Sequence, residues 1–245
     1  FDKWVKWSSP VVDFNRENYP YFYPTAGASE PLRQIIFSLG ASCEQFSIHV
    51  FKGEYEGYEA MAQAANITVV KHDRDDWETV VDHMDEFDVF FISQPSAIDG
   101  NIWEDYNAFV ETMPTNSVVA DVTYVGATKI PDIKINLNAK SIRNVVFSLS
   151  KPFGCYYDRI GGVFAREEDL GLFGNKWFKN LYSISLGSEL LDRYPVDYMW
   201  NYFHKNQYKV IKELKKEYPN LVPSDVYILA TYEHDGSNAI DNYLT

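Results

Sequence analysis

The sequence has 245 residues, of which 46 % are hydrophobic and 16 % are aromatic. These proportions indicate a globular chain with a sizeable core and exclude a disordered or fibrous protein. The formal net charge of -13 argues against nucleic acid and anionic membranes as partners, because both are themselves negatively charged.

Cysteine is rare in this chain. The 2 cysteines, Cys43 and Cys155, are far apart in the sequence and suit neither a disulfide framework nor a metal cluster. A reduced, cytoplasmic setting is therefore expected. No apolar run reaches the length of a transmembrane helix, and the first residues, "FDKWVKWSSP", do not have the pattern of a signal peptide.

Hydrophobic periodicity predicts alternating helices and strands through most of the chain. Residues 1–24 lack periodicity and are rich in aromatic residues and proline, so we expect an extended arm with turns. Apolar residues at helical spacing predict helices over 28–41, 57–65, 77–87 and 103–113. Short apolar or alternating runs predict strands over 46–51, 66–72, 88–93, 117–124 and 143–150.

This alternation predicts an α/β fold with a mainly parallel sheet covered by helices on both faces. After residue 167 the pattern changes, because 168–219 is mostly helical and 225–233 indicates one late strand. We therefore expect three parts: an N-terminal arm over 1–24, a large domain over 25–185, and a helical segment with a reduced or truncated C-terminal domain over 186–245.

Chemically useful side chains follow the predicted strands. In an open parallel sheet, ligands bind beyond the carboxyl ends of the strands. Asp121 and Tyr124 lie at the end of one predicted strand, and Lys151 follows the next. The stretch "PTAGASE" opens the first predicted helix with small residues, and such a helix start attracts an anion through its free N–H groups. An acid, a phenol, a lysine and an anion site are thus expected at one edge.

This combination suggests pyridoxal 5'-phosphate as the cofactor. A lysine forms a Schiff base with its aldehyde, and a carboxylate keeps its pyridinium nitrogen protonated. A phenol can donate a hydrogen bond to the ring oxygen. The phosphate group is held by helix N–H groups, hydroxyls and an arginine.

The stretch "FSLSKPFGCYYDRIGG" carries a resemblance to a known family. It has the pattern Ser-x-Ser-Lys, then Gly, then Arg-x-Gly with the arginine eight residues after the lysine. The sequence resembles the fold type I pyridoxal-phosphate enzymes, the aspartate-aminotransferase superfamily, from "PTAGASE" to "DRIGGVFARE". The resemblance implies that Lys151 is the Schiff-base lysine and the proton shuttle, and that Ser148 and Arg159 hold the phosphate.

Three further motifs match this family in the same order: "TAGASE", "GEYEGYEAMA" and "DVTY". The resemblance implies that the first forms the phosphate loop and that the second supplies a ring stacked on the cofactor. The third would supply the partners of the pyridinium nitrogen and the ring oxygen. The residues concerned, in motif order, are Gly27, Ala28, Ser29, Tyr55, Asp121 and Tyr124.

The chain departs from the family pattern in two places. Ala97 stands where the family has an asparagine that contacts the ring oxygen, and Ser96 or Asn101 are candidate substitutes. No arginine follows Arg193, although the family binds the substrate carboxylate through a C-terminal arginine. Either the chain is truncated before that residue, or another group such as Arg16 of the N-terminal arm binds the carboxylate.

The resemblance implies an aminotransferase that acts on an amino acid and a 2-oxo acid, and a homodimer with its active site at the subunit interface. "SLSK…RIG" is similar to the alliinase and tryptophan-aminotransferase branch, so lyase chemistry by β- or γ-elimination is an alternative. A non-catalytic cofactor-binding or assembly subunit is a third hypothesis. The five histidines show no metal-ligand spacing, so no metal is expected.

Overall fold

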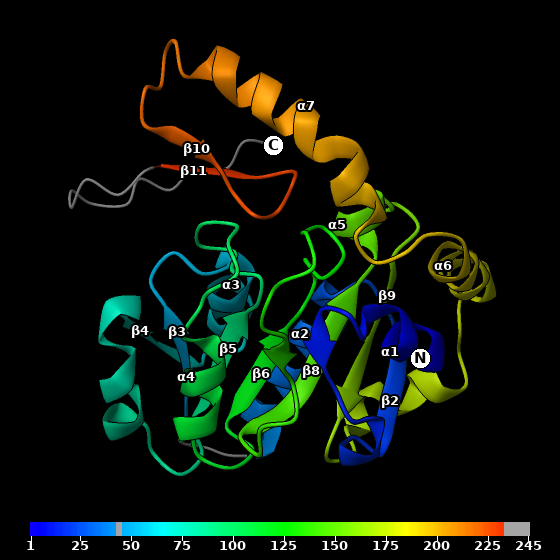
Figure 1. The fold of residues 1–245 in the computed structure, drawn as a ribbon. Coiled ribbons are helices and arrows are strands. Elements are labelled where there is room, and N and C mark those ends of the chain that lie inside the picture. The colour runs from blue at the N-terminus through cyan, green and yellow to red at the C-terminus, as the bar shows by residue number, and fades with distance from the viewer. Residues whose placement is uncertain (43–45, 233–245) are drawn as a thin grey trace.

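A seven-stranded sheet forms the centre of the molecule (Figure 1). The computed structural model describes residues 1–42 and 46–232 of the chain. The strand order across the sheet is β2-β9-β8-β6-β5-β3-β4. In chain order these strands are β2 (Tyr21–Ala26), β3 (Ser47–Phe51), β4 (Thr68–His72), β5 (Val89–Ser93), β6 (Val118–Asp121), β8 (Ile142–Ser148) and β9 (Ile160–Ala165).

The sheet is mainly parallel, as the sequence predicts. Strand β9 runs antiparallel to both of its neighbours, β8 and β2, whereas the other neighbouring strands pair in parallel. Strands β5 and β6 are buried along their whole length, because helices cover both faces of the sheet. The carboxyl ends of β5, β6 and β8 therefore lie at one edge.

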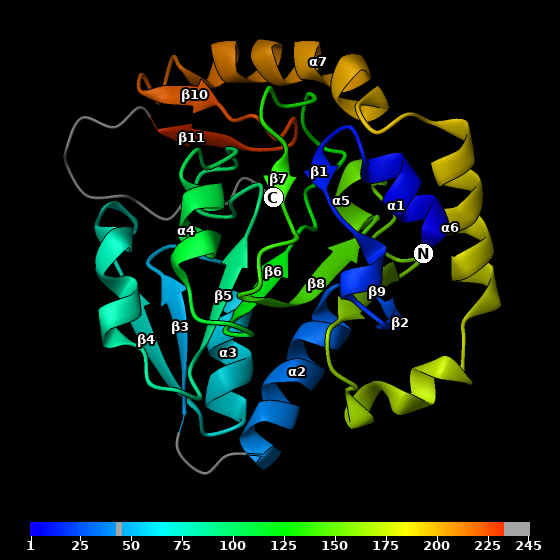
Figure 2. The same cartoon turned by 60° about the horizontal axis from the view of Figure 1, so that its bottom comes forward.

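Helices pack on the two faces through two separate apolar clusters. These helices are α1 (Asp2–Ser8), α2 (Ser29–Ser42), α3 (Glu56–Ala64) and α4 (Tyr106–Thr112). Trp4 of α1 and Phe109 of α4 belong to the first cluster, and Ile36 of α2 and Tyr58 of α3 belong to the second. Figure 2 shows α2 and α3 side by side. The predictions of these two helices and of α4 are confirmed.

The N-terminal residues do not form the extended arm that we expected. Residues 2–8 form α1, because Trp4 and Trp7 are one turn apart and both are buried against the sheet. Strand β1 (Val12–Asp13) then pairs with β7 (Ile135–Asn136), and residues 21–26 enter the central sheet as β2. Aromatic packing, rather than local periodicity, orders this segment. The division of the chain into domains stays a prediction.

Two other expected elements differ from the structure. The helix predicted over 77–87 is a 3-10 helix, Arg74–His83, kinked at Asp76. The late strand is shorter than predicted, because only β11 (Ala230–Tyr232) forms, paired antiparallel with β10 (Leu221–Pro223). Residue 233 and Cys43 lie outside the described residues. The helical character predicted for 168–219 is confirmed by α6 (Leu181–Arg193) and α7 (Tyr198–Leu214).

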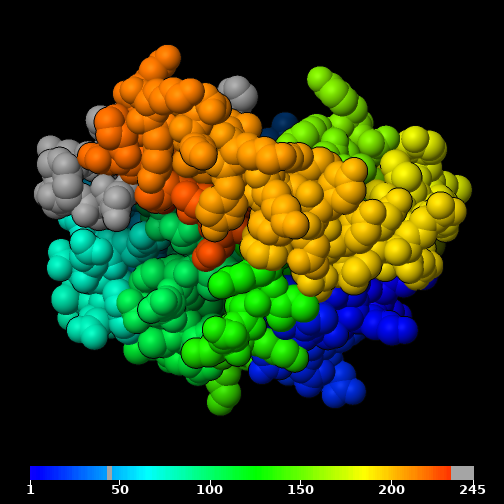
Figure 3. All heavy atoms as spheres, turned by 45° about the horizontal axis from the view of Figure 1, so that its top comes forward, coloured from blue at the N-terminus to red at the C-terminus, as the bar shows by residue number. Residues whose placement is uncertain are grey.

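The C-terminal segment lies over the strand-end edge of the sheet (Figure 1). In the space-filling view its atoms, in orange, lie against residues coloured green (Figure 3). Between β10 and β11, the backbone N–H of Val226 donates to the carbonyl of Gly100 at 2.9 Å, and that of Tyr227 donates to Ala127 at 3.0 Å. The Tyr227 hydroxyl also donates to the carbonyl of Pro152 at 3.1 Å. This segment therefore contacts the loops that follow β5, β6 and β8. Within the described part of the chain, no helix has the length and apolar character needed to cross a membrane.

Candidate active site

Lys151 lies three residues beyond the end of β8, in the short helix α5 (Ser150–Phe153). Its ammonium nitrogen is 5.8 Å from the ring centroid of Tyr124 and 5.4 Å from that of Tyr156. Burial lowers the pKa of Lys151, and the Asp121 carboxylate opposes this shift. The lysine is therefore half-buried among aromatic rings, with a larger neutral fraction than an exposed lysine would have.

Asp121 is the last residue of β6, and its side chain is buried. Its Oδ1 accepts hydrogen bonds from the backbone N–H of Thr123 at 3.0 Å and from the Thr123 hydroxyl at 2.5 Å. Its Oδ2 accepts from the Tyr58 hydroxyl at 3.1 Å. Burial raises the pKa of Asp121, whereas these hydrogen bonds and the charge of Lys151 lower it. The structure thus brings Lys151, Asp121 and Tyr124 together, as predicted.

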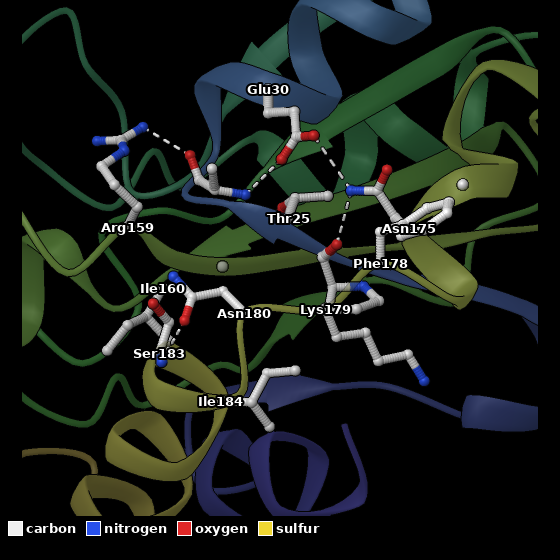
Figure 4. Close-up of a pocket in the computed structure, with 14 residues that line it drawn as sticks. Thr25, Glu30, Arg159, Ile160, Asn175, Phe178, Lys179, Asn180, Ser183 and Ile184 are labelled. Carbon is white, nitrogen blue, oxygen red and sulfur yellow. Dashed lines mark hydrogen bonds between the residues drawn. The ribbon is translucent and has the colours of Figure 1, made fainter.

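Gly27, Ala28 and Ser29 form the junction between β2 and α2, where the first N–H groups of the helix lack intrahelical partners. Gly27 has φ +72°, and a Cβ atom on it would lie 2.7 Å from Nη2 of Arg159. Arg159 Nη2 donates to the carbonyl of Ala26 at 2.7 Å (Figure 4). Its guanidinium group therefore lies against the predicted phosphate loop.

Ser148 and Arg159 are brought to the same place by the pairing of β8 with β9. Ser148 is opposite Gly161 in the sheet, and its hydroxyl donates to the carbonyl of Ile160 at 3.1 Å. A Cβ atom on Gly161 would lie 2.7 Å from Cα of Gly27, so glycine is required where β9 approaches the predicted phosphate loop. Arg159 itself has φ +51°, which is uncommon for a residue other than glycine and occurs preferentially at functional sites.

A pocket of about 400 Å³ lies beside Arg159 (Figure 4). Its lining includes Arg159, Gly161, Asn175, Lys179 and Asn180. Asn175 donates to the carbonyl of Pro24 at 2.9 Å and to Glu30 at 3.1 Å, which holds its side chain in place. The pocket is therefore next to the predicted phosphate loop rather than next to Asp121.

Tyr55 lies directly before α3, and its ring contacts Tyr58 edge-on, with 5.4 Å between the ring centroids. The Tyr58 hydroxyl is hydrogen-bonded to Asp121. Tyr55, the predicted stacking residue, therefore lies near Asp121, the predicted partner of the ring nitrogen. Our sequence reasoning missed Glu54 and Ser93, which are buried beside this group. The only sequence signal for Glu54 was its position before Tyr55.

Hydrogen bonds within the turn after β5 involve Ala97 and both of its candidate substitutes. The N–H of Ala97 donates to the Ser93 hydroxyl at 2.6 Å. The Ser96 hydroxyl is buried and accepts from the N–H of Ile98, and the Asn101 side chain accepts from the N–H of Asp225. Both candidate substitutes for the family's asparagine are therefore already engaged within the protein.

Arg16 lies apart from the other predicted site residues. Its guanidinium group stacks on Phe22 of β2, 4.3 Å from the ring centroid. Phe22 pairs with Phe164, several residues away from the pairing of Ser148 with Gly161 at the site. Within one chain, Arg16 is therefore not brought to Lys151, and its role in binding a substrate carboxylate stays a prediction. No group of residues suited to a metal ion exists in the described part of the chain.

Comparisons with known proteins identify the fold. No family model matches the sequence, and no curated protein matches it. Among solved structures, a pyridoxal-phosphate-bound C–S lyase from Staphylococcus hominis matches with a TM-score of 0.70 and 15 % identity, over 94 % of this chain and 64 % of that one. A tyrosine aminotransferase from Leishmania infantum matches with a TM-score of 0.65 and 15 % identity, over 89 % and 67 %.

A third match is an L-threonine-O-3-phosphate decarboxylase from Porphyromonas gingivalis, with a TM-score of 0.61 and 19 % identity, over 88 % of this chain and 65 % of that one. The chain thus spans about two thirds of the length of the structures it matches. Membership of the alliinase branch stays a prediction. The chain has the fold of the fold type I pyridoxal-phosphate-dependent aminotransferases and lyases.

Proposed function

We propose that the chain is a pyridoxal-phosphate-dependent aminotransferase that acts on an amino acid and a 2-oxo acid. The observation that carries the proposal is the meeting of Lys151, Asp121 and Tyr124 at one edge of the sheet, beside Ser148 and Arg159. They come from the end of β6, the end of β8 and the start of β9, and each matches one requirement of the cofactor.

The loop between β2 and α2 fits a phosphate group. Its glycine has no side chain between the backbone and Arg159, since a Cβ atom there would collide with the guanidinium group. Backbone N–H groups of Ala28 and Ser29, the positive end of the α2 dipole and the Arg159 charge would act together on a dianion. Ser148 would add a hydroxyl from the neighbouring strand end.

The group around Asp121 fits a flat, cationic ring. Asp121 would pair with the ring nitrogen, and its three hydrogen bonds from Thr123 and Tyr58 hold the carboxylate in place. Tyr124 would donate to the ring oxygen, and Tyr55 would stack on the ring. Lys151 would hold the aldehyde carbon covalently.

When bound, pyridoxal phosphate supplies an electron sink for the bonds at the substrate Cα. Lys151 would take the Cα proton as a general base and return it, because burial lowers its pKa and increases its neutral fraction near neutral pH. Asp121 would hold the proton of the ring nitrogen. The aromatic rings of Tyr124 and Tyr156 near Lys151 would limit the access of water.

A lyase that eliminates a β- or γ-substituent is the second candidate function. It is supported by the match in fold with the C–S lyase from Staphylococcus hominis, which covers 94 % of this chain. Both reactions begin when a base removes the same Cα proton, so the residues at Lys151 and Asp121 serve either one.

The two reactions are separated by incubating the purified chain, loaded with pyridoxal phosphate, with a panel of amino acids. An aminotransferase forms a new amino acid only when a 2-oxo acid is added, whereas a lyase releases ammonia and a 2-oxo acid without an acceptor. Lys151→Ala serves as the inactive control. If no amino acid alters the absorbance of the bound cofactor, the aminotransferase and lyase proposals are both rejected in favour of a non-catalytic subunit.

A further inference from the structure

A second buried carboxyl group, that of Glu54, lies in the loop between β3 and α3. Its side chain is only 8 % exposed. Oε1 accepts a hydrogen bond from the N–H of Ser93 at 3.1 Å, and Oε2 accepts from the Ser93 hydroxyl at 2.8 Å and the N–H of Tyr55 at 3.1 Å. None of the ion pairs in the described residues includes Glu54. Hydrogen-bond donors rather than a cation therefore stabilise its ionised form.

Glu54 connects three segments that surround the candidate site. It bonds the backbone of Tyr55 on one side and Ser93, the last residue of β5, on the other. The Ser93 hydroxyl also accepts a hydrogen bond of 2.6 Å from the N–H of Ala97 in the following turn. Ser93 is opposite Asp121 in the sheet. Glu54 therefore links the loop before α3 to the end of β5, and Ser93 links both to the following turn.

Glu54 is also coupled to Asp121 through charge. Burial raises the pKa of Glu54 to about 7, and the charge of Asp121 contributes to the rise. Tyr58 also faces Glu54, and burial together with both carboxylates raises the pKa of Tyr58 well above its usual value. Lys151 is the cation that acts on Asp121. A change of charge at Asp121 therefore shifts the pKa of Glu54.

We propose that Glu54 is a positioning residue of the candidate site, which orders the Tyr55 and Ala97 loops and loses a proton when a cationic ring binds at Asp121. The inference rests on the proposed function, because it requires that the cofactor ring nitrogen pairs with Asp121. Glu54 acts on the cofactor only through Asp121 and the loops, and the proton that it loses passes to the solvent.

The direction of the pH dependence follows from the pKa of Glu54. Its ordinary value is 4.5, and the folded, cofactor-free protein has about 7, so near pH 6 the folded protein holds a proton on this group. A cation next to Asp121 favours the ionised form of both carboxyls and lowers the pKa of Glu54. Binding therefore releases a proton, and the affinity for the cofactor rises as the pH increases toward 7.

The test counts the protons released when pyridoxal phosphate binds to the cofactor-free chain. Titration calorimetry at pH 7 in buffers of different ionisation enthalpy gives this number for wild type, Glu54→Gln and Glu56→Gln. Glu56 is exposed, two residues away, and undergoes the same chemical change. The wild type and Glu56→Gln are expected to release roughly half a proton more per cofactor than Glu54→Gln, since a group with a pKa near 7 is half protonated at pH 7.

Equal proton release by Glu54→Gln and wild type would overturn the inference and leave the proposed function standing. Failure of the wild type to bind pyridoxal phosphate would instead overturn the proposed function, and the inference with it. If Glu54→Gln does not fold, Ser93→Ala replaces it. Loss of the Ser93 hydroxyl removes a donor to Glu54, so the midpoint of proton release should move to higher pH, and an unchanged midpoint would contradict the proposal.

Discussion

Lys151 and Asp121 each change the protonation of the other. The ammonium group of Lys151 lowers the pKa of Asp121, which burial raises, and Asp121 raises the pKa of Lys151, which burial lowers. Neither group therefore has the pKa it would have alone. A cationic ring between the strand ends would add a third charge to this pair and favour the ionised form of Asp121.

Asp121→Asn tests this arrangement at the scale of one residue. Asparagine keeps the shape of the side chain but lacks the charge that would hold the proton on the cofactor ring nitrogen. We expect kcat for amino acid turnover to fall about a hundredfold, as for other removed electrostatic partners. Asp132→Asn, at an exposed position, should have wild-type kcat. An Asp121→Asn variant with wild-type kcat would remove Asp121 from the proposed site.

The placement of Asp121, Tyr124 and Lys151 at one edge could be predicted from the sequence, because they lie at the ends of strands that local patterns reveal. Glu54 could not, because its burial depends on Ser93, which is 39 positions away and meets it only in the folded sheet. Arg16 shows the converse: we predicted an extended arm for its segment, but its guanidinium group stacks on Phe22 of β2.

At the scale of elements, Gln207 of α7 holds the C-terminal segment over the strand ends. Its Nε2 donates to the carbonyls of Ser224 at 3.0 Å, Val226 at 3.0 Å and Leu229 at 2.6 Å. A Cβ atom on Gly100 would lie 2.8 Å from the Ser224 side chain, so this segment also packs closely on the turn after β5. The segment thus covers one side of the candidate site.

Gln207→Ala should loosen this segment, because it removes the donor to the Ser224 carbonyl and one of the two donors to each of the Val226 and Leu229 carbonyls. We expect the free energy of unfolding to fall by about 1–3 kcal/mol, the range for buried hydrogen-bonding groups left unpaired. Hydrogen exchange should accelerate at the N–H groups of Val226 and Tyr227. Asn206→Ala, exposed on the same helix, is the control. Unchanged exchange at both N–H groups in Gln207→Ala would show that other contacts hold the segment.

Elements with a clear hydrophobic periodicity could be predicted from the sequence. Elements stabilised by contacts with residues far away in the sequence could not. Leu32, Ile35 and Ile36 are buried at helical spacing in α2, so the sequence alone predicted this helix. The helix α1 has only seven residues, and such short helices depend on tertiary contacts for stability. Its stability comes from the burial of Trp4 and Trp7, which the sequence does not reveal locally.

At the scale of the whole molecule, apolar side chains are exposed just before α6 and on its first residue. Trp177 is 72 % exposed, Phe178 is 87 % exposed and Leu181 is 71 % exposed. Phe178 also lines the pocket beside Arg159. Such a group of exposed apolar side chains is typical of an interaction surface. It fits the homodimer that the sequence resemblance implies.

The double substitution Phe178→Ser with Leu181→Ser should weaken that dimer. Sedimentation equilibrium is expected to give twice the chain mass for wild type and a mass close to one chain for the variant at the same micromolar concentration. Phe87→Ser, at an exposed phenylalanine elsewhere on the surface, should stay dimeric. A wild-type protein with the mass of one chain would contradict the homodimer.

Reductive trapping tests whether Lys151 carries pyridoxal phosphate. The loaded chain is treated with borohydride, digested, and analysed by mass spectrometry. We expect the cofactor on the peptide that contains Lys151, and no trapped cofactor in Lys151→Ala. The control variant Lys129→Ala, changed at an exposed lysine, should give the cofactor trapped on Lys151 as in wild type. Trapping on another lysine, or none in the wild type, would contradict the account.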